Sequence, residues 1–340
     1  MKVMLLVMAE RRTILDRLYD AVCAHCDESV IHRLSRDQHL NLGCFLASVK
    51  YENFDRVVMF SRLKWLRSQI SVLSCVPGLV FVEHDAWQNY MVASKYFNAY
   101  AKFYQRLPWA RVLVSGTVVA RKLRDEGIDS SFVSKGYDET MLRNLDVPRD
   151  IPVGFLGSLK SSEYTQRKEM LEGIAAGSSM LVKRTESGQE YLETLNRIKI
   201  FVSADIGMGE YMIKNFEAMA CGCVLLAWSQ GEEDDLLGFE NMRNVVFYRS
   251  QSEAIDKIKM LQEDPQLAAR IARTGQAFTE QNYTFSKAGR DLAHHIQQDM
   301  RIWQRPSLLT RLWVRQRYDM RVPELDSVSE SAEALARLGR

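Results

Sequence analysis

The chain has 340 residues, of which 46% are hydrophobic and 26% are charged, the usual balance of a soluble globular protein with room for two domains. This composition excludes a disordered chain, a disulfide-stapled miniprotein and a fibre, and no apolar run reaches the roughly 18 residues of a membrane span. The net charge is +2, although residues 301–321 alone contribute +5 from six Arg and one Asp. The rest of the chain therefore lacks the general positive charge of a nucleic-acid-binding protein.

Short apolar runs alternate with helical stretches along the first 135 residues. Strands are predicted at Val3–Met8, Val30–Leu34, Arg56–Phe60, Gly78–Glu83, Val112–Val114 and Ser130–Val133, and helices at Thr13–Cys26, Trp87–Gln105 and Val118–Glu126. Apolar strands separated by helices are typical of a parallel sheet that is covered on both faces. We therefore predict a doubly wound α/β domain over residues 1–135.

The same pattern restarts after a predicted linker at residues 136–150. Strands are predicted at Pro152–Leu156, Met180–Lys183, Ile198–Val202, Val224–Trp228 and Val245–Tyr248, and helices at Ser162–Ala175, Glu190–Arg197, Ile213–Ala220 and Glu253–Gln262. This indicates a second doubly wound domain over residues 151–283. Because ligands bind outside the carboxyl ends of parallel strands, the two domains are expected to face each other across a cleft.

The start of the chain and its cysteines bear on location and on metals. Residues 1–10 have too short an apolar stretch for a secretory signal and lack a cleavage site. The six cysteines are few and irregularly spaced, which favours a reduced compartment. The pair Cys23 and Cys26 is half of a metal knuckle with no second pair to complete it, so packing is favoured over metal binding. We predict a cytoplasmic protein with no bound metal.

The most informative stretch of the chain is residues 211–228. A strand that ends near Ser203 leads through a glycine-containing loop into a helix that closes at Gly222. A helix N-terminus presents unpaired N–H groups and a positive dipole end, which suits a diphosphate. Lys214 and Glu217 are three residues apart and share one helix face, where the lysine could neutralise phosphate and the carboxylate could bind a ribose. An exposed helix with a surface ion pair is the alternative, and spacing alone leaves both open.

The sequence Lys-Asn-Phe-Glu-Ala-Met-Ala-Cys-Gly at residues 214–222 resembles the donor-site signature of retaining GT-B glycosyltransferases of the "group 1" family, in particular the spore-maturation-type branch. The resemblance covers about residues 110–295, and residues 1–110 match in architecture only. It implies a GT-B fold, with two Rossmann-like domains facing a cleft and a C-terminal helix at residues 284–300 that crosses back. It also implies a retaining hexosyltransferase that moves a sugar from a nucleotide-diphospho-sugar to a hydroxyl acceptor without a metal or cofactor.

The resemblance extends to individual donor-site residues. Glu217 is similar to the family's ribose-binding glutamate, and Lys214 matches its basic residue, where it would stabilise the departing diphosphate together with the helix start at residues 211–213, which includes Tyr211. Gly157 and Ser158 fall on the loop that approaches the donor phosphates. Two further phosphate-binding candidates are Lys160 and Arg184.

One position departs from the family's pattern. The family usually carries a first glutamate eight residues before the second, and this chain has Gly209 there. Glu210 lies seven residues before Glu217. Either the loop is shifted by one residue, or the carboxylate that contacts the sugar is missing.

Titratable side chains follow a predicted strand of the first domain. Glu83, His84 and Asp85 come at the carboxyl end of that strand, where the cleft is expected, so they could position an acceptor hydroxyl or act as a base. The alternative is that Asp85 caps a helix beside a surface histidine. The acidic run Glu232–Asp235 is expected to be a solvated loop, with a place in the cleft wall as its alternative.

The expected setting is the synthesis of a bacterial surface polysaccharide or glycolipid, with a nucleotide sugar as donor, a glycan or glycolipid as acceptor and no nucleic acid. A catalytically silent GT-B-like module that binds a nucleotide or partner is the alternative from another class. A sugar-nucleotide epimerase and a phosphorylase of the same fold are further alternatives. The sequence leaves the oligomeric state open.

The tail at residues 301–340 begins with interleaved arginines and aromatic residues. Pro306 can start a helix in which Leu308, Leu309, Leu312 and Trp313 share one face. Such a basic amphipathic helix can lie on the inner face of a membrane, which would give peripheral membrane contact through residues 301–321. The favoured interpretation is that this apolar stripe packs on the protein or on another copy.

Overall fold

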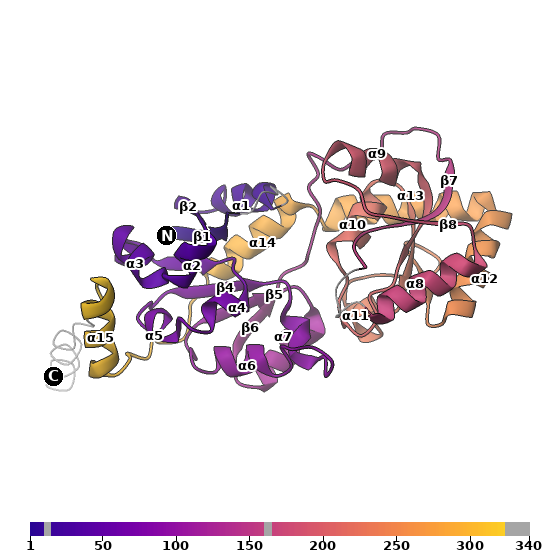
Figure 1. Cartoon of the computed structure of the whole chain (residues 1–340). Helices are drawn as coiled ribbons and strands as arrows, with labels where there is room; N and C mark the ends of the chain where they lie inside the picture. The colour runs from indigo at the N-terminus through magenta and orange to yellow at the C-terminus, as the bar shows by residue number, and fades with distance from the viewer. Residues whose placement is uncertain (10–14, 160–164, 324–340) are drawn as a thin grey trace, which may run out of the picture.

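The computed structural model describes residues 1–9, 15–159 and 165–323, and it contains two parallel sheets (Figure 1). The first sheet has six strands, which are β1 (Lys2–Met8), β2 (Glu28–Leu34), β3 (Arg56–Met59), β4 (Leu79–Glu83), β5 (Arg111–Val114) and β6 (Asp129–Phe132), in the order β2-β1-β3-β4-β5-β6. The second has five, which are β7 (Ile151–Leu156), β8 (Met180–Lys183), β9 (Ile198–Ser203), β10 (Val224–Trp228) and β11 (Val246–Tyr248), in the order β11-β10-β9-β7-β8. The predicted fold class of two doubly wound α/β domains is confirmed.

Helices connect the strands and cover both faces of each sheet. The first domain contains α1 (Asp16–Cys23), α2 (Arg36–Leu40), α3 (Leu42–Ser48), α4 (Leu63–Leu66), α5 (Ile70–Leu73), α6 (Ala99–Tyr104) and α7 (Thr117–Asp125), with two 3-10 helices, η1 (Tyr51–Asn53) and η2 (Ala86–Tyr90). The second contains α8 (Thr165–Gly177), α9 (Gln189–Arg197), α10 (Ile213–Ala220), α11 (Glu232–Leu236), α12 (Gln251–Glu263) and α13 (Pro265–Asn282). Two more helices follow, α14 (Phe285–Gln297) and α15 (Leu308–Tyr318).

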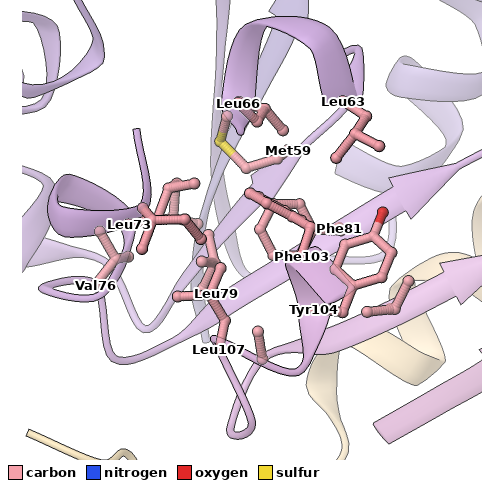
Figure 2. Close-up of a cluster of buried hydrophobic side chains, with 14 of the residues drawn as sticks. Met59, Leu63, Leu66, Leu73, Val76, Leu79, Phe81, Phe103, Tyr104 and Leu107 are labelled. Atoms are coloured by element: carbon pink, nitrogen blue, oxygen red, sulfur yellow. The ribbon is translucent and has the colours of Figure 1, made fainter. Parts of the chain in front are cut away.

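Strand β1 explains why the first domain has two cores. Side chains of a strand alternate between faces, so Met4 and Leu6 pack into one hydrophobic cluster while Val3 and Leu5 pack into the other. All four are fully buried, as expected for a central parallel strand. Figure 2 shows part of the first cluster, where side chains from the strands and from the helices α4, α5 and α6 interlock, among them Met59, Leu66, Phe81 and Phe103.

The second domain is linked to the first at two places. Residues 142–150 of the linker contain no helix or strand, and Tyr137 exchanges backbone hydrogen bonds with Tyr283 and Phe285, each 2.9 Å long. Helix α14 then packs on α1, where any side chain at Gly289 would collide with Ala21. The last helix before the tail therefore belongs to the core of the first domain.

One predicted helix, Trp87–Gln105, is wrong for much of its length. The structure contains the 3-10 helix η2 and the short helix α6 with turns between them. Two asparagines interrupt the helical backbone pattern. The side chain of Asn89 accepts a hydrogen bond from the Ala101 amide at 3.1 Å, and Asn98 adopts a left-handed φ of 55°. Polar side chains that bond locally compete with helix formation, and the run contains several of them.

The acidic run Glu232–Asp235 is also different from its prediction as a solvated loop. It forms most of helix α11, and the side chains of Glu233 and Asp234 are buried. Gly231 precedes the helix with a φ of 72°, which lets the chain turn sharply into it. Because these carboxylates have partners inside the protein, burial is tolerated.

None of the helices in the described part of the chain is long and apolar enough to cross a bilayer.

Candidate functional site

A cavity of about 360 Å3 lies between the two domains. One wall comes from the carboxyl ends of the strands β1, β4, β5 and β6 of the first domain together with α1 and α14, and the other from α8 and the start of α10 in the second. The side chains of three predicted catalytic residues line this cavity, namely His84, Asp85 and Lys214. Residues more than a hundred positions apart in the sequence therefore meet at the predicted cleft.

The start of α10 is shaped by a buried carboxylate. Asp205 accepts hydrogen bonds from the Met212 amide at 3.1 Å and from the Asn215 side chain at 2.7 Å, and it forms an ion pair with Arg167 of α8. Gly207 lies in the same loop with a φ of 74°, a conformation that other residues rarely adopt. These contacts hold the N-terminal end of α10 at the cavity wall, where its dipole favours a negative ligand.

Lys214, Tyr191 and Glu217 form a cluster at α10, of which Lys214 lines the cavity while Tyr191 and Glu217 do not. The ammonium of Lys214 lies 4.6 Å from the centroid of the Tyr191 ring, and the Tyr191 hydroxyl donates to Glu217 Oε2 at 2.5 Å. Burial raises the pKa of Glu217, and the charge of Lys214 opposes that rise. Glu217 is thus held within a turn of Lys214, as their spacing predicted, but it is a buried group, so the alternative of a surface ion pair is not what the structure contains.

The loop after β7 approaches Lys214. A Cβ atom on Gly157 would lie 3.4 Å from Cε of Lys214, so this glycine and the lysine are neighbours. The Gly157 amide donates to the Lys183 carbonyl at 3.0 Å, which leaves that N–H engaged within the sheet edge. Ser158 follows directly, and the predicted phosphate residue Lys160 lies outside the described residues. Arg184 is exposed beyond β8 and is not among the residues that line the cavity.

The loop before α10 places Gly209, Glu210 and Tyr211 in different surroundings. Glu210 is 1% exposed, forms an ion pair with Lys135 at 3.0 Å and accepts from Ser115 at 2.9 Å, so it joins the two domains. Burial raises its pKa to about 7, and Lys135 opposes that rise. Tyr211 is buried in the core of the second domain with its hydroxyl on Asp234. Their predicted contacts with a donor therefore compete with partners inside the protein.

Gly209 has the opposite environment. It has a φ of 64°, its amide donates to the Gln230 side chain at 3.1 Å, and a Cβ atom built there would meet no other atom within 4 Å. Open space faces the position at which the resemblance expects a glutamate.

A second cavity, of about 440 Å3, adjoins the first on the side of the first domain and shares His84 and Asp85 with it. Several buried polar atoms around it have no hydrogen-bond partner in the described protein: Ser61 Oγ, Trp87 Nε1 and both ring nitrogens of His84. Buried polar groups without a partner are rare in proteins, so these atoms mark the surroundings of this cavity as a candidate polar site. Sequence reasoning missed Ser61 and Trp87, although both follow strands that end at the cleft.

The titratable groups after β4 are strongly perturbed. Burial, together with the nearby charge of Lys135, lowers the pKa of His84 to about 4, so the imidazole is neutral at pH 7. Burial also raises the pKa of Glu83, whose carboxylate accepts a hydrogen bond from the Asp85 amide at 2.9 Å. Asp85 makes no side-chain cap to the helix η2 that follows it. The capping alternative for Asp85 is thus not seen.

Helix α11 joins the second domain to the first at another point. The carboxylate of Glu233 accepts hydrogen bonds from the amides of Thr117 and Val118, at 2.9 and 3.0 Å, at the first turn of α7. Beside it, Glu232 pairs with Arg121. An acid of one domain thus caps a helix of the other, which aligns both walls of the cavity.

The family model described as "Glycosyl transferase-like" matches residues 142–293, which span the second domain and most of α14. No curated protein has a significant match to the chain.

Solved structures match over nearly the whole chain. Anabaena HepE in complex with UDP and glucose aligns with a TM-score of 0.63 and 14% identity, over 88% of this chain and 100% of its own. The sucrose-phosphate synthase of Thermosynechococcus elongatus aligns with a TM-score of 0.63 and 12% identity, over 86% of this chain and 98% of its own. The T4 phage glucosyltransferase in complex with UDP-glucose aligns with a TM-score of 0.56 and 12% identity, over 87% of this chain and 99% of its own.

The chain has the GT-B fold. Its second domain matches the glycosyltransferase-like family model, and the signature helix α10 lies inside the matched range. The comparisons do not single out the spore-maturation-type branch. Among residues 1–9, 15–159 and 165–323, no group of three or more His, Cys, Asp or Glu side chains is arranged to hold a metal ion.

Proposed function

We propose that this GT-B chain is a glycosyltransferase that transfers a sugar from a nucleotide-diphospho-sugar to a hydroxyl acceptor. One observation carries the proposal: Lys214 and the start of α10 line the cavity between the domains on one side, and His84 and Asp85 line it on the other. The residues proposed to act on the donor and those proposed to act on the acceptor thus line one cavity. The structural neighbours that were solved with UDP, glucose or UDP-glucose support a donor of this class.

The diphosphate of the donor is proposed to lie at the start of α10. The positive end of the helix dipole and the Lys214 ammonium act on the same region, and the glycine at position 157 keeps the β7 loop from filling it. As the glycosidic bond breaks, negative charge builds on the departing diphosphate, and these fixed positive groups stabilise it.

The nucleoside is proposed to extend from there towards Glu217. In the described protein, the Tyr191 hydroxyl is the hydrogen-bond donor to this carboxylate and occupies one of its oxygens. The lone pairs that remain suit the two hydroxyls of a ribose. Tyr191 then has a second role, because its ring supports the Lys214 ammonium from the other side.

The acceptor is proposed to bind in the second cavity, beside His84 and Trp87. A hydroxyl-rich ligand would satisfy the polar atoms that lack partners there. The neutral imidazole of His84 can accept a hydrogen bond from the reacting hydroxyl, and Asp85 lies where both cavities meet. Basic side chains of the same cavity, Lys64 and Lys95, favour an acceptor with a negative group near that hydroxyl. A glycan or glycolipid of a bacterial surface, made on the cytoplasmic side, fits this description.

Retention of the anomeric configuration and a hexose as the transferred sugar follow from the sequence resemblance and are part of the proposal. Proton NMR of the product measures the anomeric configuration directly. Inversion would contradict the retaining assignment while leaving the transfer itself in place.

A second candidate function is a catalytically silent module that binds a nucleotide. It is favoured by the loop before α10, where position 209 carries no side chain and Glu210 is engaged with Lys135. No carboxylate of that loop is then available to contact the sugar of a donor.

Calorimetry with a panel of nucleoside diphosphates, followed by hydrolysis assays with the matching nucleotide sugars, tests both functions. A glycosyltransferase binds one base preferentially and slowly hydrolyses the corresponding sugar nucleotide, and Asp85→Asn lowers the hydrolysis rate. Binding without any hydrolysis or transfer would support the silent module. Absence of binding to every member of the panel would reject both.

A further inference from the structure

Helix α15 is attached to the first domain by one of its faces. Val314 and Met320 are fully buried, and the Trp303 indole donates to the Ser74 carbonyl at 3.0 Å. The ring of Tyr318 lies so close to Gly43 of α3 that no side chain would fit there. Figure 1 places α15 at the end of the first domain that is far from the second. The tail therefore packs on the first domain, but not through the apolar stripe that the packing interpretation named.

The residues that make this attachment are not those of the predicted apolar stripe. Leu308, Leu309, Leu312 and Trp313, which we call the outer face of α15, are 61%, 80%, 52% and 49% exposed. At 3.6 residues per turn, these four lie on the side of the helix opposite Val314 and Tyr318. The helix thus buries one side and presents an apolar side to solvent, which marks an interaction surface.

Positively charged side chains flank this outer face. Arg315 and Arg317 fall on its two edges by the same helical geometry, and both are exposed. The segment 301–321 holds six Arg and one Asp, the most basic stretch of the sequence. A helix with apolar residues on one side, arginines at the borders and a tryptophan is suited to the interface of a lipid bilayer.

We propose that the outer face of α15 docks the protein on an anionic membrane surface, with the helix lying in the plane of the interface. A second copy of the chain is disfavoured as occupant because a two-fold interface would bring the arginine-containing helices of both copies together, and residues 308–318 contain no acidic side chain to pair with them. An anionic surface instead attracts them, by about a fivefold gain in binding for each basic residue close to the headgroups. This proposal does not depend on the cleft and its chemistry.

Co-sedimentation of the full-length protein with vesicles tests the proposal. The vesicles are made of phosphatidylcholine with or without phosphatidylglycerol, and binding is measured at low salt and at about 1 M salt, where charges are screened within about 3 Å. We expect binding to the anionic vesicles at low salt that is largely lost at high salt and with phosphatidylcholine alone.

Two pairs of variants separate the apolar face from the charge. Leu309→Glu should weaken vesicle binding at least tenfold, whereas Val92→Glu, at a residue that is also 80% exposed, should leave it unchanged. Arg315→Gln combined with Arg317→Gln should weaken binding by about 25-fold. The same double exchange at Arg270 and Arg273 of α13 alters the net charge equally and should have little effect.

Three results would overturn the proposal. The first is that the wild type does not bind anionic vesicles at low salt, and the second is that Leu309→Glu binds them as tightly as the wild type. The third is that the wild type forms a concentration-dependent dimer that Leu309→Glu dissociates. Calorimetry of nucleoside diphosphate binding is run on the same variants. Because α15 is remote from the cavity, these variants should keep wild-type nucleotide affinity whether or not they bind vesicles.

Discussion

Replacement of Glu217 by glutamine isolates the charge of the proposed ribose-binding group. The amide retains the size of the side chain and an oxygen that can accept the hydrogen bond of Tyr191, so the local packing is preserved. A hydrogen bond to a charged acceptor contributes about 1.5–3 kcal/mol and one to a neutral acceptor about 0.5–1.5 kcal/mol. For the two hydroxyls of a ribose, the loss is about 2–3 kcal/mol, or about 30- to 150-fold in affinity.

Replacement of Glu217 by alanine should have a second effect, on stability. It removes the acceptor of the Tyr191 hydroxyl beside a buried position, which costs about 1–3 kcal/mol. For a chain of 340 residues, this corresponds to a fall in Tm of about 1.5–4 °C. The glutamine variant should show little of this fall, so the pair of variants separates binding from folding.

Calorimetry with the preferred nucleoside diphosphate measures the loss of affinity, and thermal unfolding measures the change in Tm. Glu190→Gln is the control, because it makes the same chemical change at an exposed glutamate of α9 that pairs with Lys183. Equal affinities of the wild type and of Glu217→Gln for every nucleoside diphosphate would remove Glu217 from the proposed site.

Lys214→Ala should lower kcat more than donor affinity, and added chelator should change neither parameter; a raised KM with equal kcat would make Lys214 a simple anchor. Glu233→Ala removes the cap of α7, which should lower the free energy of unfolding by about 2–3 kcal/mol and Tm by about 3–4 °C. Glu232→Ala, at the exposed neighbour, should leave Tm nearly unchanged, and similar falls in Tm for both variants would contradict the capping role. The pKa of Glu210 is raised to about 7, so between about pH 4.5 and 7 the folded chain retains a proton that the unfolded chain releases. The wild type should therefore lose stability relative to Glu210→Gln as the pH rises through this range, and a difference in Tm that stays constant would refute this prediction.

The locally encoded parts of this protein were predictable because they depend on patterns of neighbouring residues. The run Val3–Val7 is apolar at every position, which is typical of a parallel strand that is buried on both faces. Helix α10 has the predicted bounds Ile213–Ala220, since its apolar positions and the glycine that follows it are read directly from the sequence. The spacing of Lys214 and Glu217 likewise placed both on one helical face.

Other features depend on partners that are distant in the sequence. The run Glu232–Asp235 looks like a solvated loop until α7 of the other domain offers its unpaired amides to Glu233. The sequence position of Glu210 suggests a contact with the donor sugar, but in the structure it pairs with Lys135 and accepts a hydrogen bond from Ser115 of the first domain. Water solvates a carboxylate strongly, so a carboxylate is buried only where the fold supplies partners, and those partners decide its role.

The sequence by itself determined the two parallel sheets, the helix that carries the donor signature and the basic amphipathic character of the tail. Only the tertiary structure decided which face of α15 packs on the protein, because Val314 and the stripe that begins at Leu308 are equally apolar in the sequence. It also decided that Ser61 and Trp87 leave polar atoms unpaired beside His84, around one cavity. Periodicity reports which residues can share a face, whereas the surface that a face meets depends on contacts between distant segments, which no local pattern contains.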